Sequence, residues 1–228
     1  KEAMHKEFPE YRYIDGGGNI GFGKAQNKGM QSQDARYYFV LNPDTIFVDN
    51  SNILRAMYDA MEKHTEIGII GPKLLYPDNS LQYSCYSFPK FLDQPLGRLQ
   101  LDKKFDWIKK RTDKLLMKDF DHNRVKAVDW LMGSALFVRK KAIEQVGMFD
   151  DRYFMYLEDC DWCRRMWVNG WQVIYHSEIV LYHKHRRQSA DIPGILSVLK
   201  NKMTRIHITS WLQYFIKWKF RRGTRNFS

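Results

Sequence analysis

Short hydrophobic runs alternate with amphipathic segments along the first part of the chain. The apolar runs 37–41 and 67–71 predict buried strands, because a strand covered on both faces has little room for polar side chains. Segment 51–63 carries hydrophobic residues at helical spacing, and we also expect a helix over 23–31. A short strand over 11–14 would precede the first helix. The pattern therefore predicts a β-α-β unit and a mostly parallel sheet.

The rest of the chain continues this alternation of strands and helices. The pattern predicts a hairpin at 77–79, one or two short surface helices within 89–123, a strand over 128–138 that breaks at Gly133-Ser134, helices over 140–146 and 158–169, and strands over 171–175 and 179–182. Gly147 and Gly170 follow the two helices, as is common at helix C termini. We therefore predict an α/β domain over residues 1–190 and a helical C-terminal extension over 191–228.

Charge separates the extension from the domain. The chain has 228 residues and a net charge of +11, and from residue 184 onward eleven basic residues accompany one acidic residue. A basic tail favours an anionic partner, either lipid or nucleic acid. Its apolar positions are typical of an interfacial helix: Ile208, Trp211, Leu212, Phe215 and Trp218. The same side chains would alternatively pack back onto the domain or against a second copy of the chain.

The three cysteines do not indicate a disulfide framework, and their number favours a reducing compartment. Cys160 and Cys163 form a C-x-x-C within a predicted helix, and the chain has no second Cys or His pair at ligand spacing. We therefore expect two buried helix cysteines rather than a redox or zinc site.

Asp44 is the first candidate for chemistry. Pro43 ends the strand 37–41, because proline has no N–H for a ladder, and this places Asp44 at the carboxyl end of the strand. Ligands of open α/β sheets bind at such ends, and a carboxylate there suits a hard cation with a phosphorylated ligand. Downstream, Glu158 and Asp159 begin a helix, and His183 ends a strand. The other reading of these residues is a turn aspartate, helix-capping acids and a structural histidine.

A second motif supports a different function. Gly16-x-Gly18-x-x-Gly21 matches the dinucleotide fingerprint, which would make the protein an oxidoreductase. The fingerprint requires a preceding strand and a second mononucleotide-binding half, and a glycine-rich turn is the simpler interpretation.

Several collinear blocks resemble bacterial glycosyltransferase family 2 enzymes, in particular rhamnosyltransferase-like members of cell-surface polysaccharide synthesis. These blocks are 19–29 (similar to N-x-G-F-x-x-A-x-N-x-G), 41–45 (the L-N-P-D form of the metal-binding D-x-D motif), 130–135 (W-x-x-G-A), 147–161 (G-x-F-D-E-x-F-F-x-Y-x-E-D-x-D), 180–189 (V-x-H-x-x-x-x-S) and the tail segments 207–210 and 214–218.

The resemblance implies a GT-A-like, Rossmann-like fold and an inverting, metal-dependent hexosyl transfer. It implies Asp159 as general base, with Glu158 as the next candidate. The donor would lie near Asn19, Gly21, Phe22, Asn27, Asn42 and Asp44; the acceptor near Trp130, Gly133 and Tyr156; and Mg²⁺ or Mn²⁺ on Asp44 and His183. The resemblance begins partway into the family's fold, after its first strands, so we expect an N-terminally incomplete sheet.

The expected reaction moves L-rhamnose from dTDP-rhamnose, or another hexose from a UDP-sugar, to a saccharide or lipid-linked acceptor. The protein would be cytoplasmic, attached to the inner face of the plasma membrane through its tail, without a nucleic-acid partner, and a homodimer is one expectation. The competing class is a non-enzymatic module whose basic tail binds nucleic acid or membrane.

Overall fold

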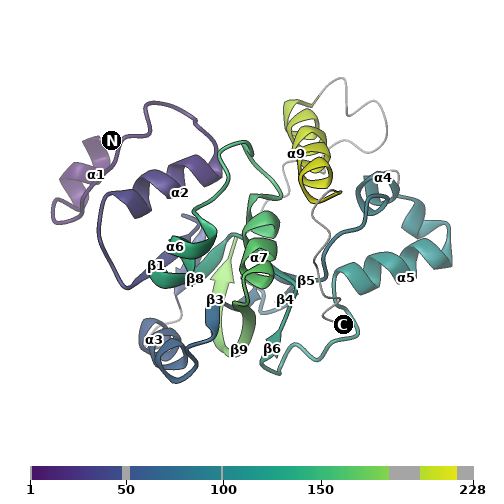
Figure 1. The fold of residues 1–228 in the computed structure, drawn as a ribbon, viewed down its shortest axis with the longest axis horizontal. Coiled ribbons are helices and arrows are strands. Elements are labelled where there is room, and N and C mark those ends of the chain that lie inside the picture. The colour runs from purple at the N-terminus through teal and green to yellow at the C-terminus, as the bar shows by residue number, and fades with distance from the viewer. Residues whose placement is uncertain (1, 48–51, 99, 185–200, 220–228) are drawn as a thin grey trace.

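The computed structural model describes residues 2–47, 52–98, 100–184 and 201–219, and the structural statements below refer to these residues. A central sheet lies between helices on both of its faces (Figure 1). Its main strands follow the order β1 (Tyr37–Leu41), β8 (Ala135–Arg139), β3 (Ile67–Leu75), β9 (Gln172–His183) and β2 (Thr45–Phe47), with β4 (Leu81–Gln82) beside β3 and β6 (Lys126–Ala127) beside β9. A separate small sheet pairs β5 (Cys85–Tyr86) with β7 (Trp130–Leu131).

The helices are α1 (Glu2–Glu7), α2 (Phe22–Gln31), α3 (Ile53–Lys63), α4 (Asp93–Arg98), α5 (Asp106–Leu115), α6 (Lys140–Val146), α7 (Glu158–Val168) and α9 (Lys202–Lys219), with a 3₁₀ turn at Leu101–Lys103. None of the described helices is long and apolar enough to span a membrane. The predicted helices at 140–146 and 158–169 and the surface helices within 89–123 are confirmed.

Two hydrophobic cores cover the two faces of the sheet. Along β3, Ile69 joins the core beneath α6 and α7, whereas Ile70 joins the core beneath α3, and both side chains are fully buried. Successive strand residues point to opposite faces. The continuous apolar run of β3 therefore follows from burial on both sides, as its sequence predicted.

The strand pairing corrects one part of the predicted fold. Within the described sheet, β3 and β9 are parallel, whereas the pairings of β1, β2, β4, β6 and β8 are antiparallel, so the sheet is mixed rather than mostly parallel. The predicted strand at 11–14 is also wrong, because these residues form no strand and Tyr11 is 66% exposed. Without that strand, α2 and β1 do not complete the predicted β-α-β unit.

The last two predicted strands form one long strand. β9 runs through both predicted segments, and its pairing with β3 shifts register between Pro72 and Lys73. The shift accommodates extra residues of β9 around Ser177 as a bulge. The sequence suggested two strands because residues 176–178 interrupt the apolar pattern, whereas the structure continues the ladder through them.

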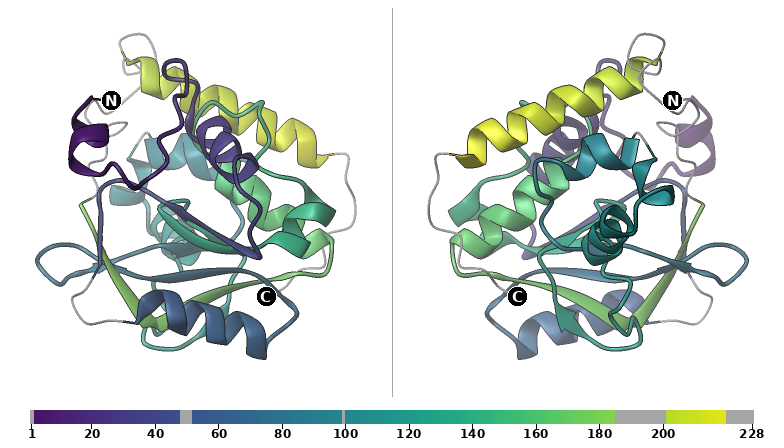
Figure 2. Two further views of the ribbon diagram at one scale, coloured as in Figure 1. Left: turned by 90° about the vertical axis from the view of Figure 1, so that its left-hand side faces the viewer. Right: turned by 90° about the vertical axis from the view of Figure 1, so that its right-hand side faces the viewer.

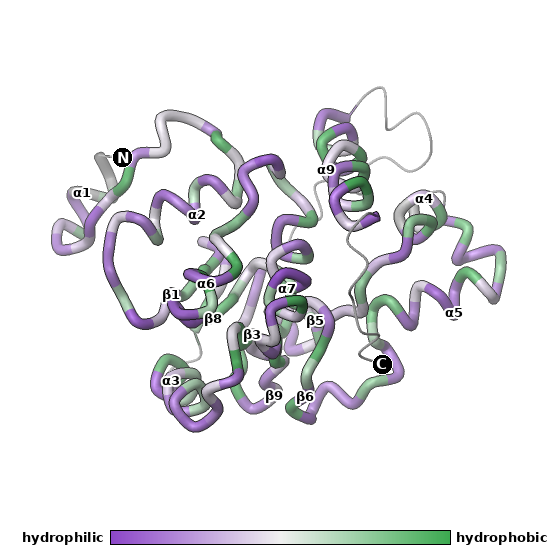
Figure 3. The backbone as a smooth tube through the Cα atoms, in the orientation of Figure 1, coloured by the Kyte–Doolittle hydropathy of each residue, from purple (hydrophilic) through white to green (hydrophobic). Residues whose placement is uncertain are grey.

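The C-terminal helix α9 lies against α7 and the segment before it (Figure 2). Hydrophobic and hydrophilic residues occur around its axis (Figure 3). Trp211 and Trp218 are 9% and 5% exposed and pack with Tyr153, Leu157 and Cys160. The expectation that these tryptophans face a membrane is therefore wrong, and the alternative that they pack back onto the domain is confirmed. Much of the tail, 185–200 and 220–228, lies outside the described residues.

Candidate functional site

Two strand pairings bring Asp44 and His183 together from opposite ends of the chain. β2 begins directly after Asp44, and its register places Thr45 opposite His183 on β9. The backbone N–H of Lys184 donates to the carbonyl oxygen of Asp44 at 3.0 Å. Oδ1 of Asp44 then lies 3.1 Å from Nε2 of His183. The predicted metal-binding pair is thus formed by ordinary antiparallel pairing.

A third residue orients the imidazole. Nδ1 of His183 lies 2.7 Å from Oε1 of Gln82 on β4, and a proton on Nδ1 would donate to that oxygen and leave the Nε2 lone pair for a cation beside Asp44. Burial lowers the pKa of His183, although Asp44 opposes this shift, and the ring is therefore neutral at pH 7. Gln82 was not a candidate from the sequence, where it is one polar position in an alternating strand.

The donor set of this pair fits a hard divalent cation. A carboxylate oxygen that is partly open to solvent and a neutral imidazole nitrogen face each other at about the spacing of adjacent ligands around an ion with bonds of about 2.1 Å. No group of three His, Cys, Asp or Glu side chains with metal-ligand geometry occurs in the described residues. A cation held here would therefore take most of its ligands from a phosphorylated substrate and water, as Mg²⁺ commonly does.

Asp159 is held in a defined orientation at the start of α7. Its Oδ2 accepts the N–H of Gly133 and its Oδ1 accepts the N–H of Cys160, both at 2.7 Å. The residue is only 9% exposed, and burial raises the pKa of its carboxyl group, although the two backbone donors favour the ionised form. The indole of Trp130 lies near this carboxyl outside hydrogen-bond geometry. A raised pKa and a fixed orientation suit a general base.

Glu158 is in a different electrostatic state from its neighbour. Its side chain is 5% exposed, and Oε2 has no hydrogen-bond partner in the described structure. Burial, and then the charge of Asp159, raise its pKa well above the ordinary value. Because Asp159 has two donors and Glu158 Oε2 has none, Asp159 ionises first and Glu158 keeps its proton to higher pH.

A glycine allows the backbone to approach Asp159 closely. A Cβ atom added to Gly133 would lie 3.2 Å from the Phe22 ring and 3.3 Å from Oδ2 of Asp159. Contacts this short would push the neighbours aside. Gly133, predicted on the acceptor side, therefore lies directly between Phe22 and Asp159.

The glycine-rich segment before α2 packs against the segment 149–157. Gly21 has a φ of +91°, and a Cβ atom there would lie 2.3 Å from the carbonyl oxygen of Phe154, so only glycine fits. The N–H of Phe22 donates to that same oxygen at 3.0 Å. Asn19 is exposed, and its Oδ1 accepts the N–H of Gly21 at 3.2 Å. The missing strand before these glycines argues against a dinucleotide site.

Asn27 contacts the same segment from α2. Its Nδ2 donates to the carbonyl oxygen of Phe149 at 2.8 Å and to Asp151 at 2.9 Å, while its Oδ1 accepts the N–H of Phe149 at 3.0 Å. These bonds engage both ends of the amide. Asn27, predicted to lie near the donor, thus fixes the segment that precedes Asp159.

The Asp44 pair and Asp159 belong to adjacent turns. The N–H of Asn42 donates to the carbonyl oxygen of Ser134 at 2.9 Å, next to Gly133. This contact continues the β1–β8 register, in which Leu41 faces Ala135. Buried polar atoms around these turns have no partner in the described structure: Gln82 Nε2, Ser84 Oγ, Ser134 Oγ and Glu158 Oε2. Since buried polar groups are normally paired, these atoms are available to a polar ligand.

Aromatic side chains line the region beside Asp159. Trp130 packs on Tyr86 with ring centroids 4.5 Å apart, and Tyr156 stacks on His207 of α9 at 4.5 Å. Sugars commonly pack on aromatic faces, so the predicted acceptor residues Trp130 and Tyr156 have suitable surroundings. His207 was not predicted and belongs to the tail.

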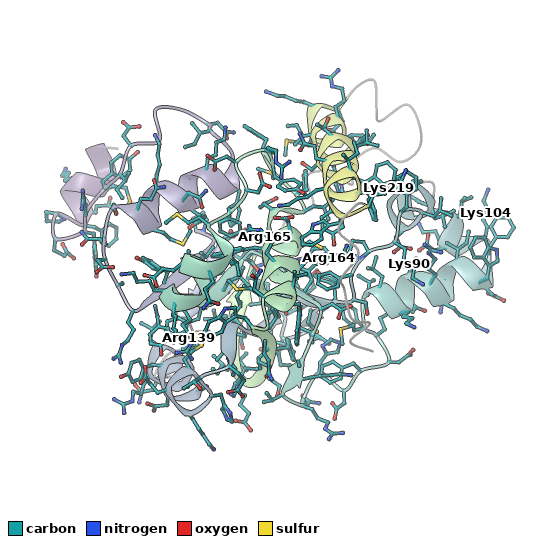
Figure 4. The ribbon with its side chains drawn as sticks, in the orientation of Figure 1. Lys90, Lys104, Arg139, Arg164, Arg165 and Lys219 are labelled. Atoms are coloured by element: carbon teal, nitrogen blue, oxygen red, sulfur yellow. The ribbon has the colours of Figure 1, made fainter. Side chains whose placement is uncertain are left out.

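The remaining polar residues of α7 are structural. Arg164 and Arg165 extend from α7 toward different neighbours (Figure 4). Nε of Arg165 donates at 2.9 Å to Oδ2 of Asp161, which lies four residues earlier on the same helix. Cys160 and Cys163 are buried free thiols whose pKa values are raised by burial, which confirms the prediction of ordinary helix cysteines.

Comparisons with known proteins show which chains this one resembles. A family model described as "Glycosyl transferase family group 2" matches residues 105–218, which is half of the chain. The N-acetylglucosaminyl-diphospho-decaprenol L-rhamnosyltransferase of Mycobacterium tuberculosis is 29% identical over 96% of this chain and 75% of its own length. The rhamnosyltransferase WbbL of Escherichia coli is 26% identical over 90% of this chain and 73% of its own length.

Two further similarities are more partial. The low-salt glycan biosynthesis hexosyltransferase Agl10 of Haloferax volcanii is 26% identical over 68% of this chain and 46% of its own length. The crystal structure of GalNAc-T7 with UDP, GalNAc and Mn²⁺ superposes with a TM-score of 0.55 and 9% identity, and the chain spans half of that solved chain. At this identity the likeness shows the fold alone, and it confirms the GT-A-like α/β fold.

Proposed function

This chain belongs to glycosyl transferase family group 2, and we propose that it transfers a hexose from a nucleotide-sugar donor to a saccharide or lipid-linked saccharide acceptor with inversion at the anomeric carbon. The names of the relatives favour L-rhamnose from dTDP-rhamnose within cell-surface glycan synthesis. Another hexose from a UDP-sugar is the second candidate, since one relative is called a hexosyltransferase.

The position of Asp159 carries this proposal. A buried carboxylate fixed by the N–H groups of Gly133 and Cys160 is prepared to take one proton from an acceptor hydroxyl. The activated oxygen then attacks the anomeric carbon from the face opposite the leaving diphosphate, and this single displacement inverts the centre. Trp130 and Tyr156 orient the acceptor, and the raised pKa of Glu158 disfavours a second negative charge beside the base.

Asp44 and His183 hold the donor end of the site. The converging Oδ1 and Nε2 atoms would bind Mg²⁺ or Mn²⁺, which supplies positive charge to the leaving diphosphate. Gln82 keeps the imidazole in the tautomer that this role needs. The hydrogen bond from Asn42 to Ser134 connects this end of the site to the turn that holds Asp159. This backbone hydrogen bond therefore couples the position of the metal-binding pair to the position of the base.

A lipid-linked acceptor would bring the protein to a membrane surface on the cytoplasmic side. With Trp211 and Trp218 buried, the exposed apolar residues of α9 are Leu212 and Ile216, at 43% and 64% exposure, and the sequence beyond α9 is basic. We include peripheral membrane attachment through this face of α9 in the proposal. Association of two copies through the same face is the alternative.

A donor screen on the full protein tests the proposal. Purified protein with Mn²⁺ is titrated calorimetrically with dTDP-rhamnose, UDP-glucose and UDP-N-acetylglucosamine, and with NAD and a single-stranded oligonucleotide as the competing ligands. Metal-dependent binding of one nucleotide sugar is the expected result. Binding of NAD or of the oligonucleotide, with no nucleotide sugar bound, would overturn the proposal and restore the oxidoreductase or nucleic-acid alternative.

A further inference from the structure

Lys217 of the C-terminal helix is a buried cation. Its side chain is only 8% exposed, and its Nζ lies 2.7 Å from Oδ2 of Asp150 and 2.7 Å from the carboxylate of Asp161. Lys217 is one of the basic residues of the tail from which the sequence predicted an anionic partner. The structure uses it instead within the protein, so the net charge of the tail overstates the charge available on its surface.

Asp161 receives a second contact from the same helix. Nε1 of Trp218 donates to its Oδ1 at 2.9 Å, in addition to the bond from Arg165. The Asp161 side chain has no solvent exposure. A fully buried carboxylate depends on its partners, because loss of one leaves an uncompensated charge in a low-dielectric interior. Of the three described side chains that hold this carboxylate, two thus belong to α9.

The two carboxylates held by Lys217 lie on either side of a strained segment. Between Asp150 and Asp161, the backbone of Tyr156 and Leu157 has φ values of +71° and +66°. Non-glycine residues seldom adopt this left-handed conformation, which persists only where the surroundings impose it. Asp159 follows two residues after this turn, so the turn sets the direction from which α7 presents it.

α9 also contacts the strained segment at its centre. Oγ of Ser210 donates to the carbonyl oxygen of Met155 at 2.7 Å, and the His207 ring stacks on Tyr156 with an interplanar angle of 29°. Tyr214 of α9 is fully buried and packs with Tyr153 and Leu157. The helix therefore contacts the segment at both of its ends and at its centre.

We propose that Lys217 and Trp218 are positioning residues that fix the turn at Tyr156 and Leu157 and thereby aim Asp159 at the acceptor hydroxyl. The proposal rests on the proposed role of Asp159 as general base. An apolar side chain in place of Lys217 would be enough to attach α9 to a hydrophobic surface. The buried ammonium between two carboxylates adds a geometric requirement, because it fixes their separation on the two sides of the turn.

The test compares substitutions on one helix in the full protein. Lys217→Met removes the charge and keeps the length of the side chain, Lys217→Arg keeps the charge, and Lys202→Met makes the same change at the exposed start of α9. Calorimetric titration with dTDP and Mn²⁺ gives the affinity and the fraction of molecules with an intact donor site. Turnover of dTDP-rhamnose is then expressed per dTDP-binding site, well below the melting temperature.

Turnover by Lys217→Met is expected to fall by about 10- to 100-fold with unchanged dTDP affinity, the loss that a misplacement of about 1 Å produces. Lys217→Arg should recover most of this turnover, and Lys202→Met should match the unmodified protein. Wild-type turnover per binding site in Lys217→Met would refute the positioning role. A fall in the number of dTDP sites that fully accounts for the lost turnover would refute it as well, since the role would then be in stability alone.

Three further variants keep the outcomes separate. If Lys217→Met does not fold, Ser210→Ala removes one bond to the same segment and is compared with Thr209→Ala, whose hydroxyl bonds only within α9 in the described contacts. Ser210→Ala should lower turnover and Thr209→Ala should not; equal turnover in both refutes the proposal. Asp159→Asn is measured in parallel. If it is inactive while Lys217→Met is normal, the positioning role alone fails; if it is fully active, the assignment of the base fails and the positioning role with it.

Discussion

Nε2 of His183 lies 3.1 Å from Oδ1 of Asp44, although 139 residues separate the two positions along the chain. The imidazole is buried and neutral, whereas the carboxylate remains partly open to solvent. A neutral nitrogen lone pair beside a carboxylate leaves a place for positive charge between them. This arrangement predicts where the divalent cation and the donor diphosphate meet the protein.

Asp44→Ala should abolish the effect of Mn²⁺ on dTDP binding. The cation has few anionic protein ligands in the described site, so loss of this carboxylate should weaken metal-dependent affinity by at least about tenfold. Calorimetric titrations with and without Mn²⁺ measure the effect. Asp119→Ala, which removes an exposed carboxylate elsewhere, is the control. Undiminished metal-dependent affinity in Asp44→Ala would contradict the metal assignment.

Asp159→Asn should keep the shape of the site and remove the proton acceptor. We expect turnover to fall by about two to four orders of magnitude while dTDP still binds. Glu158→Gln should have a much smaller effect, because burial raises the pKa of its carboxyl group and the amide closely resembles the protonated acid. Steady-state rates of both variants under identical conditions provide the comparison. A larger loss in Glu158→Gln than in Asp159→Asn would exchange the two roles.

The pH dependence of the reaction should reflect the burial of Asp159. Burial raises the pKa of this carboxyl group, and only the ionised form accepts a proton. Activity should therefore be complete at pH values above the raised pKa and fall as the pH decreases through it. The acid limb of log(kcat/KM) should lie above the ordinary aspartate value of about 3.9. A limb at or below that value would mean that Asp159 is not the group that titrates.

Gly133→Ala should disturb the position of the Asp159 carboxylate more than it disturbs the stability of the fold. The added methyl group would lie 3.3 Å from the carboxylate oxygen of Asp159 and 3.2 Å from Phe22, so one of them must shift. We expect turnover to fall by about tenfold or more, with a loss of stability of about 1–3 kcal/mol. Gly97→Ala, where a methyl group meets no atom within 4 Å, is the matched control. Equal rates in the two variants would show that the close approach at Gly133 is unimportant for turnover.

Membrane attachment should depend on the outer face of α9. Leu212→Glu combined with Ile216→Glu places charge on the two exposed apolar positions and leaves the buried face intact. Co-sedimentation with anionic vesicles should fall by about tenfold in this variant, and binding by the unmodified protein should weaken in high salt. Val168→Glu changes an exposed apolar residue on α7 and should bind normally. Vesicle binding by the double variant equal to that of the unmodified protein would contradict membrane attachment through this face.

Local features of the sequence determined much of the fold and of the site. The apolar run of β3 predicted a strand buried on both faces, and Gly147 marked the end of α6. The motif around Asp44 and the acidic pair at 158–159 identified residues that the structure brings to adjacent turns. These predictions depended on short-range pattern and on resemblance, and both are contained in contiguous segments.

Other relationships depended on segments that are distant in sequence. No local pattern distinguishes Gln82 as the partner of His183, because its role comes from the pairing of β4 with β3 beside β9. The apolar and basic spacing of α9 favoured a membrane surface but was also consistent with the protein interior. The tertiary structure placed Trp218 and Lys217 against Asp161, because a buried carboxylate at the start of α7 requires donors that its own helix does not fully supply.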